Sequence, residues 1–161
     1  KKDRHELRRK LRRVEEAGVV SQTFCETSDT IPSCMDDFFR LHRASRPDKA
    51  EFMTPARESF FVDMALELGA RDQFRLAFLE LDGTRVAACI GFDYLDSYLL
   101  YNSGYDPGYS RLSVGLVSKA LAVKDAIEAG KRSFNFLRGT ERYKYSLGAK
   151  DLAVYQLTVR R

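Results

Sequence analysis

The chain has 161 residues, of which 44% are hydrophobic and 31% are charged. This composition is typical of a folded domain with its own core and excludes a disordered chain. No apolar run approaches the roughly 20 residues of a membrane-spanning helix, and the first residues lack the apolar core of a signal peptide. We therefore expect a cytoplasmic globular domain without a membrane span.

The net charge of +4 is confined to the first residues of the chain. Residues 1–17 contain eight Lys or Arg and four acidic residues, whereas the rest of the chain contains 19 of each sign. A nucleic-acid-binding domain usually carries its positive charge on the folded surface that makes the contact. A neutral body therefore argues against nucleic acid as a partner, and we interpret residues 1–17 as a solvated basic connecting helix.

The residue pattern gives little support for metal or thiol chemistry. The cysteines Cys25, Cys34 and Cys89 have no C-x-x-C spacing and suit a reducing compartment. The histidines His5 and His42 are 37 positions apart and form no metal-ligand motif. We predict no metal site and no cysteine nucleophile.

Hydrophobic periodicity, glycines and prolines define the expected elements. In chain order they are a helix over 3–17, a strand over 19–25, helices over 32–44 and 54–68 separated by a loop over 45–53, strands over 74–81, 86–94 and 98–103, a helix over 113–129, a strand over 134–136, a helix over 141–147 and a strand over 153–159. The apolar positions of the helix over 113–129 place Lys119 and Lys124 on its exposed face.

This order is β-α-α-β-β-β-α-β-α-β after a basic N-terminal helix. Three antiparallel strands precede one β-α-β crossover, which is right-handed in nearly all such units. The predicted fold class is therefore α/β (an α+β mixed sheet), with helices on both faces of the sheet.

A turn at 104–112 links the strand over 98–103 to the helix over 113–129, with Gly108 and Gly115 on either side of the helix start. Glycine allows a ligand to approach the backbone closely, and the first N–H groups of a helix lack intrahelical partners. This combination predicts a candidate site for an anion such as a phosphate.

Two explanations of this turn stay open. Arg111 adds a positive charge that suits a diphosphate. A capped crossover helix, with Ser110 or Ser113 as the N-cap, accounts for the same residues without a ligand. The glycines form neither a Walker A motif nor G-x-G-x-x-G, which argues against nucleoside triphosphate hydrolysis and the usual dinucleotide site.

The second candidate site is the segment from Arg138 to Tyr145, after the second strand of the crossover. Open α/β sheets bind ligands at the C-terminal ends of parallel strands, so this segment is expected beside the turn. Glu141 is a candidate general base, and Tyr143 or Tyr145 a candidate general acid. Arg138 or Lys144 is a candidate anion clamp. The alternative is an Arg/Glu salt-bridge cluster at the start of a helix.

Asp93 and Glu80 are weaker candidates for the same cleft, on two of the expected strands. Exposed carboxylates on strands usually only face solvent. The aromatic residues on strands are interpreted as core rather than as platforms for base stacking.

These motifs, in this order, resemble the GNAT superfamily of N-acyltransferases. They are most similar to the second half of bacterial CelD-type acetyltransferases, whose neighbours are the Fem peptidyltransferases. The resemblance covers nearly the whole chain, and its most specific part is the run 134–144. The segments that carry it are Leu100–Tyr105, Pro107–Gly108, Ser113–Gly115, Ala126–Gly130, Phe134–Gly139 and Glu141–Lys144.

The resemblance implies acetyl-CoA, or another acyl-CoA, as the co-substrate, bound between splayed parallel strands with its pyrophosphate on the turn before the helix over 113–129. It implies direct attack of an amine on the thioester, whose carbonyl the backbone of the third meander strand polarises. The residues matched to cofactor binding are Ser103, Gly104, Gly108, Arg111, Ser113, Val114, Gly115, Asn135 and Arg138. The residues matched to catalysis are Glu141, Tyr143 and Lys144.

The expected function is an acyl-CoA-dependent N-acyltransferase that acts on an amine of a small molecule, a sugar or a cell-envelope precursor. The alternatives are a Fem-like transferase that uses aminoacyl-tRNA and a non-catalytic GNAT-like module in polysaccharide assembly. We expect a basic connecting helix over 1–18 and one GNAT-like domain over 19–161. This domain would be the C-terminal half of a longer protein, with the N-terminal half as a partner.

Overall fold

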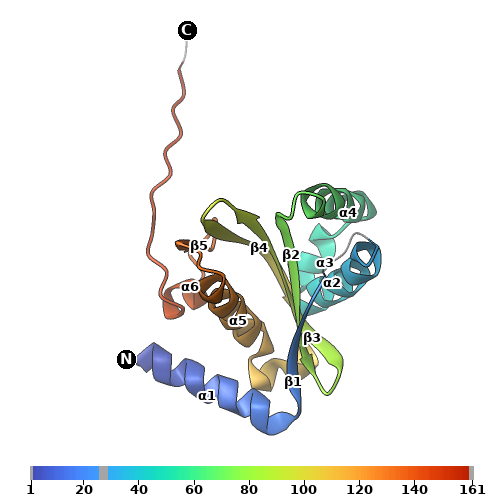
Figure 1. Ribbon diagram of the computed structural model, residues 1–161, viewed down its shortest axis with the longest axis vertical. Coiled ribbons are helices and arrows are strands. Elements are labelled where there is room, and N and C mark those ends of the chain that lie inside the picture. Colours follow the sequence, from blue (N-terminus) through green and yellow to red (C-terminus); the bar gives the residue numbers. More distant parts are fainter. Residues whose placement is uncertain (1, 26–28, 160–161) are drawn as a thin grey trace.

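The computed structural model describes residues 2–25 and 29–159. The elements in these ranges are shown in Figure 1. They are α1 (Lys2–Ala17), β1 (Val20–Phe24), α2 (Ile31–Ser45), α3 (Pro47–Phe52), α4 (Pro55–Gly69), β2 (Phe74–Leu81), β3 (Thr84–Tyr94), β4 (Ser97–Tyr105), the 3₁₀ helix η1 (Pro107–Leu112), α5 (Val114–Glu128), β5 (Ser133–Asn135) and α6 (Arg142–Ser146).

The strands form one mixed sheet in the order β1-β2-β3-β4-β5. Strands β1 to β4 pair antiparallel, and β4 pairs parallel with β5 after the crossover through α5. Helices α2, α3 and α4 lie on one side of the sheet, and α5 and α6 lie on the other (Figure 1). The predicted α/β class, with helices on both faces of a mixed sheet, is confirmed.

Each face of the sheet has its own apolar core. Phe38 and Phe61, from α2 and α4, are fully buried on one face with Phe78 of the sheet. On the other face, Val14 of α1 is only 1% exposed and belongs to the same cluster as Val117 of α5. The basic helix is therefore anchored to the domain by apolar packing.

Two expectations about local structure are wrong. The strand predicted over 153–159 is absent: this segment has no helix or strand, and Val154 and Tyr155 are 92% and 91% exposed. The neighbouring strand β5 has only three residues, which is too short an edge to hold a further strand. The loop predicted over 45–53 contains α3, whose six residues are too few to show a helical period.

Gly104 of β4 allows α2 to approach the sheet, because a Cβ there would lie 2.4 Å from the backbone nitrogen of His42. We expect Gly104→Ala to lower the free energy of unfolding by about 1–3 kcal/mol through overpacking, measured by urea denaturation. Gly108→Ala is the control, because its Cβ would meet only the Asp106 side chain, at 3.1 Å. Equal losses in the two variants would contradict this account of Gly104.

Candidate active site

Strand β4 loses its second neighbour partway along its length. β5 pairs only with residues 97–99 of β4. Just beyond this point the register between β3 and β4 shifts, and Tyr101 is the extra residue of a bulge. Residues 100–105 therefore have a strand partner on the β3 side only. We call this stretch the open edge of β4.

Two side chains bind the backbone of Ser103 at the open edge of β4. Lys49 Nζ, from α3, donates to the Ser103 carbonyl oxygen at 2.5 Å. Asn102 Oδ1 accepts from the Ser103 N–H at 2.8 Å. Burial, followed by the positive charges of Lys119 and Arg46, lowers the pKa of Lys49 to about 8. The Lys49 amine is therefore partly neutral just above neutral pH.

His42 of α2 is a second buried nitrogen base near Lys49. It is 1% exposed, and its Nδ1 has no hydrogen-bond partner in the part of the chain that the structure describes. Its ring packs against Phe38 and Phe52, at centroid distances of 5.5 and 6.0 Å. Burial and then the charge of Lys49 lower the pKa of His42 to about 4, against the effect of a hydrogen bond with Asn102. His42 is therefore neutral at physiological pH.

The turn before α5 gathers positive charge. Ser113 occupies the N-cap position with φ of +59°, but its side chain makes no capping hydrogen bond. Its hydroxyl instead accepts from Lys10 Nζ of α1 at 2.9 Å. Arg13, also from α1, donates to the carbonyl oxygen of Arg111 at 3.2 Å. Three cationic residues thus lie beside a helix N-terminus whose N–H groups have no side-chain cap.

The structure gives packing reasons for several residues of this turn. Val114 is fully buried and belongs to the apolar core beneath the turn. A Cβ on Gly115 would lie 2.9 Å from the Tyr105 ring. The N–H of Gly108 donates to Asp106 Oδ1 at 2.8 Å. An anion site here therefore depends on the cations and on the helix N–H groups rather than on the glycines.

The loop before α6 is held by Lys144, which is 5% exposed. Lys144 Nζ donates to the Arg138 carbonyl oxygen at 2.6 Å and lies 2.9 Å from Glu141 Oε2. The hydrogen bond from Lys144 lowers the pKa of Glu141. A carboxylate held in its ionised form by a partner lysine is a weak proton acceptor.

Tyr143 of α6 faces α5. Lys119 Nζ lies 5.0 Å from the centre of the Tyr143 ring and donates to the Gly115 carbonyl oxygen at 2.7 Å. Burial raises the pKa of Tyr143 to about 12, so the phenol keeps its proton at neutral pH. Through Lys119, the segment over 138–145 therefore lies beside the first turn of α5. Lys49 of α3 reaches the open edge of β4 at Ser103.

Two further candidate residues, Asn135 and Asp93, have hydrogen-bond or ion-pair partners away from the open edge of β4. Asn135 Oδ1 accepts from the N–H of Leu137 at 2.8 Å, within the loop after β5. Asp93 forms ion pairs with Arg75 and Lys131. These contacts account for the Asp93 carboxylate without the candidate site.

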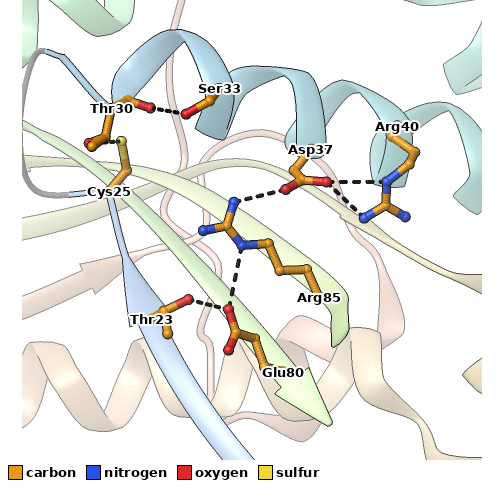
Figure 2. Close-up of polar contacts among 8 residues, drawn as sticks. All are labelled: Thr23, Cys25, Thr30, Ser33, Asp37, Arg40, Glu80 and Arg85. Carbon is orange, nitrogen blue, oxygen red and sulfur yellow. Dashed lines mark hydrogen bonds and ion pairs between the residues drawn. The ribbon is translucent and has the colours of Figure 1, made fainter. Parts of the chain in front are cut away.

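Glu80 belongs to a polar network that joins strands β1, β2 and β3 to helix α2 (Figure 2). It accepts from Thr23 Oγ1 at 2.8 Å and pairs with Arg85 at 3.4 Å. Arg85 in turn reaches Asp37 of α2 at 2.8 Å. These partners fix Glu80 in the network rather than at the open edge of β4.

Sequence reasoning missed four cationic residues of the candidate site: Lys49 at the open edge of β4, Lys119 on α5, and Lys10 and Arg13 beside the turn before α5. The expectation that Lys119 is exposed is wrong, because it is 9% exposed. Its spacing of four residues from Gly115 places the two on one helix face, which is the signal that could have found it. Lys49 lies in an expected loop and gave no such signal.

Within residues 2–25 and 29–159, no three His, Cys, Asp or Glu side chains gather as a metal site. In the same ranges, no helix is both long enough and apolar enough to cross a bilayer. The three cysteines are free. Burial raises the pKa of Cys25, to about 11, and that of Cys89, so neither is a thiolate nucleophile at neutral pH.

Comparisons with known proteins bear on the family and the fold of this chain. The family described as "Acetyltransferase (GNAT) domain" matches residues 1–145. An aminoglycoside acetyltransferase from an uncultured soil metagenomic sample, solved with sisomicin, superposes with a TM-score of 0.60 at 12% identity, over 88% of this chain and 97% of that one. AAC(6′)-Iy, in complex with a bisubstrate analogue made of CoA and acetylneamine, gives 0.61 at 11% identity, over 89% and 99%. No curated protein matches the chain in sequence.

The ribosomal-protein-S18-alanine N-acetyltransferase of Escherichia coli also shares the fold, with a TM-score of 0.57 at 18% identity, over 80% of this chain and 74% of that one. At these identities the structural similarity shows the fold, and the family match shows the relationship. The chain belongs to the acetyltransferase (GNAT) domain family, as its motifs predicted. It is a GNAT-type N-acetyltransferase.

His42 couples stability to pH. Its folded-state pKa of about 4 lies below the unfolded value of about 6.5, so the unfolded state takes up the proton first on acidification. The contribution of neutral His42 is complete above pH ~6.5 and is lost as the pH falls towards about 4. Between pH ~7 and ~4, we expect wild type to lose about 3 kcal/mol more unfolding free energy than His42→Phe. Urea denaturation across this range measures the difference, and parallel curves would contradict it.

Proposed function

We propose that this domain transfers the acetyl group of acetyl-CoA to a primary amine, with the thioester lying along the open edge of β4. The observation that carries the proposal is that this free strand edge leads to a helix N-terminus surrounded by cations. An extended pantetheine chain has amide groups that can pair with a free strand edge. Its pyrophosphate then reaches the first N–H groups of α5.

The proposed pyrophosphate ligands are Arg111, Ser113 and the accessible N–H groups at the start of α5, including that of Gly115. Lys10 and Arg13 of α1 supply further positive charge, since both already contact this turn. Charge-assisted hydrogen bonds from such groups to phosphate are stronger than neutral ones. We therefore assign α1 to the binding of acetyl-CoA.

The reacting carbonyl is proposed to lie at Ser103, whose N–H would exchange its hydrogen bond to Asn102 Oδ1 for one to the developing oxyanion. Tyr143 is proposed to protonate the departing CoA thiolate, because its raised pKa keeps the phenol protonated. Lys144 and Glu141 are proposed to hold the loop that starts at Arg138 beside the reacting groups. The lowered pKa of Glu141 favours this positioning role over that of general base.

The proposed acceptor is an amine on a sugar or a cell-envelope precursor. Support comes from the run 134–144, which resembles that of CelD-type acetyltransferases. Aminoglycoside acetyltransferases also share the fold, which makes neamine a suitable acceptor probe.

Isothermal titration calorimetry with acetyl-CoA tests the proposed function directly. We expect saturable binding that Arg111→Ala weakens without loss of helical circular dichroism. Gly115 is unsuitable for this test, because any side chain there would meet Tyr105. Absence of binding at millimolar acetyl-CoA would refute the proposal. Displacement by aminoacyl-tRNA would favour the Fem-like alternative, and binding without turnover of any amine would favour a non-catalytic module.

Replacing Lys10 and Arg13 together by alanine tests the role of α1. We expect about tenfold weaker acetyl-CoA binding at low salt, and a smaller difference at high salt, because screening weakens charge pairs. The double variant Arg8→Ala with Arg12→Ala is the matched control: it removes the same charge from exposed positions of the same helix. Equal weakening in both double variants would show that only net charge matters.

A further inference from the structure

We propose that Lys49 is a catalytic residue of this domain, the general base that takes the proton from the attacking amine. The inference rests on the proposed function, which places the acetyl-CoA thioester at Ser103. Neither the motifs of the chain nor its expected elements assign a role to this lysine.

The position of Lys49 is the first argument. Its Nζ donates to the carbonyl oxygen of Ser103, the residue whose N–H is proposed to bind the thioester oxygen. An amine that attacks a thioester lying at Ser103 therefore comes within reach of Nζ. Tyr143, the proposed acid, lies on α6 on the other side of the sheet from α3, so acid and base approach the thioester from different elements (Figure 1).

The position of Nζ is well defined by α3. Pro47 occupies the first turn of this helix, after Arg46 in an extended conformation. The carbonyl oxygen of Lys49 accepts from the N–H of Met53 at 3.1 Å. Both ends of the residue are thus held, by the helix and by the hydrogen bond to Ser103.

The surroundings of Lys49 favour its neutral form. The titratable and charged groups that face it from the packed elements are His42 of α2, Arg46 just before α3, Asp48 of α3, Cys89 of β3 and Lys119 of α5. His42 is neutral, and burial keeps the Cys89 thiol protonated. Asp48 is engaged by Arg46 at 2.7 Å.

Burial and the two nearby cations therefore act together on the Lys49 ammonium. Its pKa of about 8 is closer to neutrality than that of Tyr143, at about 12. A general base works best when its pKa lies near the operating pH. Lys49 therefore meets this condition, whereas Tyr143 does not.

The proton balance of the reaction is complete. The nitrogen lone pair of the acceptor attacks the thioester carbon, and a C–N bond forms as the C–S bond breaks. The proton on the attacking nitrogen passes to the neutral Lys49 Nζ. The CoA thiolate takes the proton of Tyr143, which regains one from solvent, and the Lys49 ammonium releases its proton to solvent.

Two substitutions separate this role from a structural one. Lys49→Arg keeps a cation and a donor for Ser103 but stays protonated at all relevant pH values. Lys49→Met removes both the donor and the base. With neamine as acceptor, we expect each variant to lose at least about 100-fold in kcat, with less than about a threefold change in acetyl-CoA affinity by calorimetry. Lys124→Met, an exposed position on α5, is the control and should match wild type.

The pH profile gives a second readout. The kcat of wild type should rise with an inflection near pH 8, and this inflection should be absent in Lys49→Arg. A kcat in Lys49→Arg within threefold of wild type, with the same inflection, would overturn the proposal.

A third measurement does not depend on the acceptor. After reductive ¹³C-methylation of the lysines, the resonance missing in Lys49→Arg should titrate near pH 8 and shift when CoA is added. An unchanged Lys49 resonance under conditions where calorimetry shows bound CoA would overturn the proposal for Lys49 alone. If wild type binds no CoA at all, the proposed function itself fails.

Discussion

The departure of β5 from β4 after three residue pairs is the constraint on which the candidate site depends. The bulge at Tyr101 coincides with this departure and leaves one edge of β4 without a strand partner. Backbone groups without a strand partner bond to other groups, and at half-buried Ser103 these are Lys49 and Asn102. Lys49 therefore contacts the same strand edge that is proposed to offer backbone groups to the substrate.

Three lysines near this edge are buried or half-buried, and each uses a backbone carbonyl as a partner. Lys49 donates to Ser103, Lys119 to Gly115 and Lys144 to Arg138. A carbonyl dipole offsets only part of the cost of burying an ammonium, whereas a carboxylate offsets more. Lys144 has Glu141 as a carboxylate partner. Lys49 and Lys119 lack one within the described residues, and burial lowers the pKa of both. Lys144 therefore holds a loop, whereas Lys49 and Lys119 release their protons more readily.

The parts of the fold predictable from the sequence were those with a repeated local signal. Strand alternation and the turn at Asp82-Gly83 defined the meander, and Thr54-Pro55 defined the start of α4. The tail after residue 150 has the same alternation but pairs with no strand, and only tertiary structure decides such a case. His42 lies against β4 because Gly104 lets α2 approach the strand, a contact between residues about 60 positions apart that has no local signature.

The N-terminal helix shows how charge and packing combine. Its composition suggested a solvated connector, but Val14 is part of the core and Leu11 packs against the same cluster. Once this apolar side is fixed on α5 and η1, the helix period brings Lys10 and Arg13 to the turn and leaves Arg8 and Arg12 exposed. The excess positive charge of the chain therefore lies beside the proposed phosphate site, where a ligand carrying several negative charges would bring the complex close to neutrality. The apolar residues that fix α1 on the domain thus also determine where its positive charges lie.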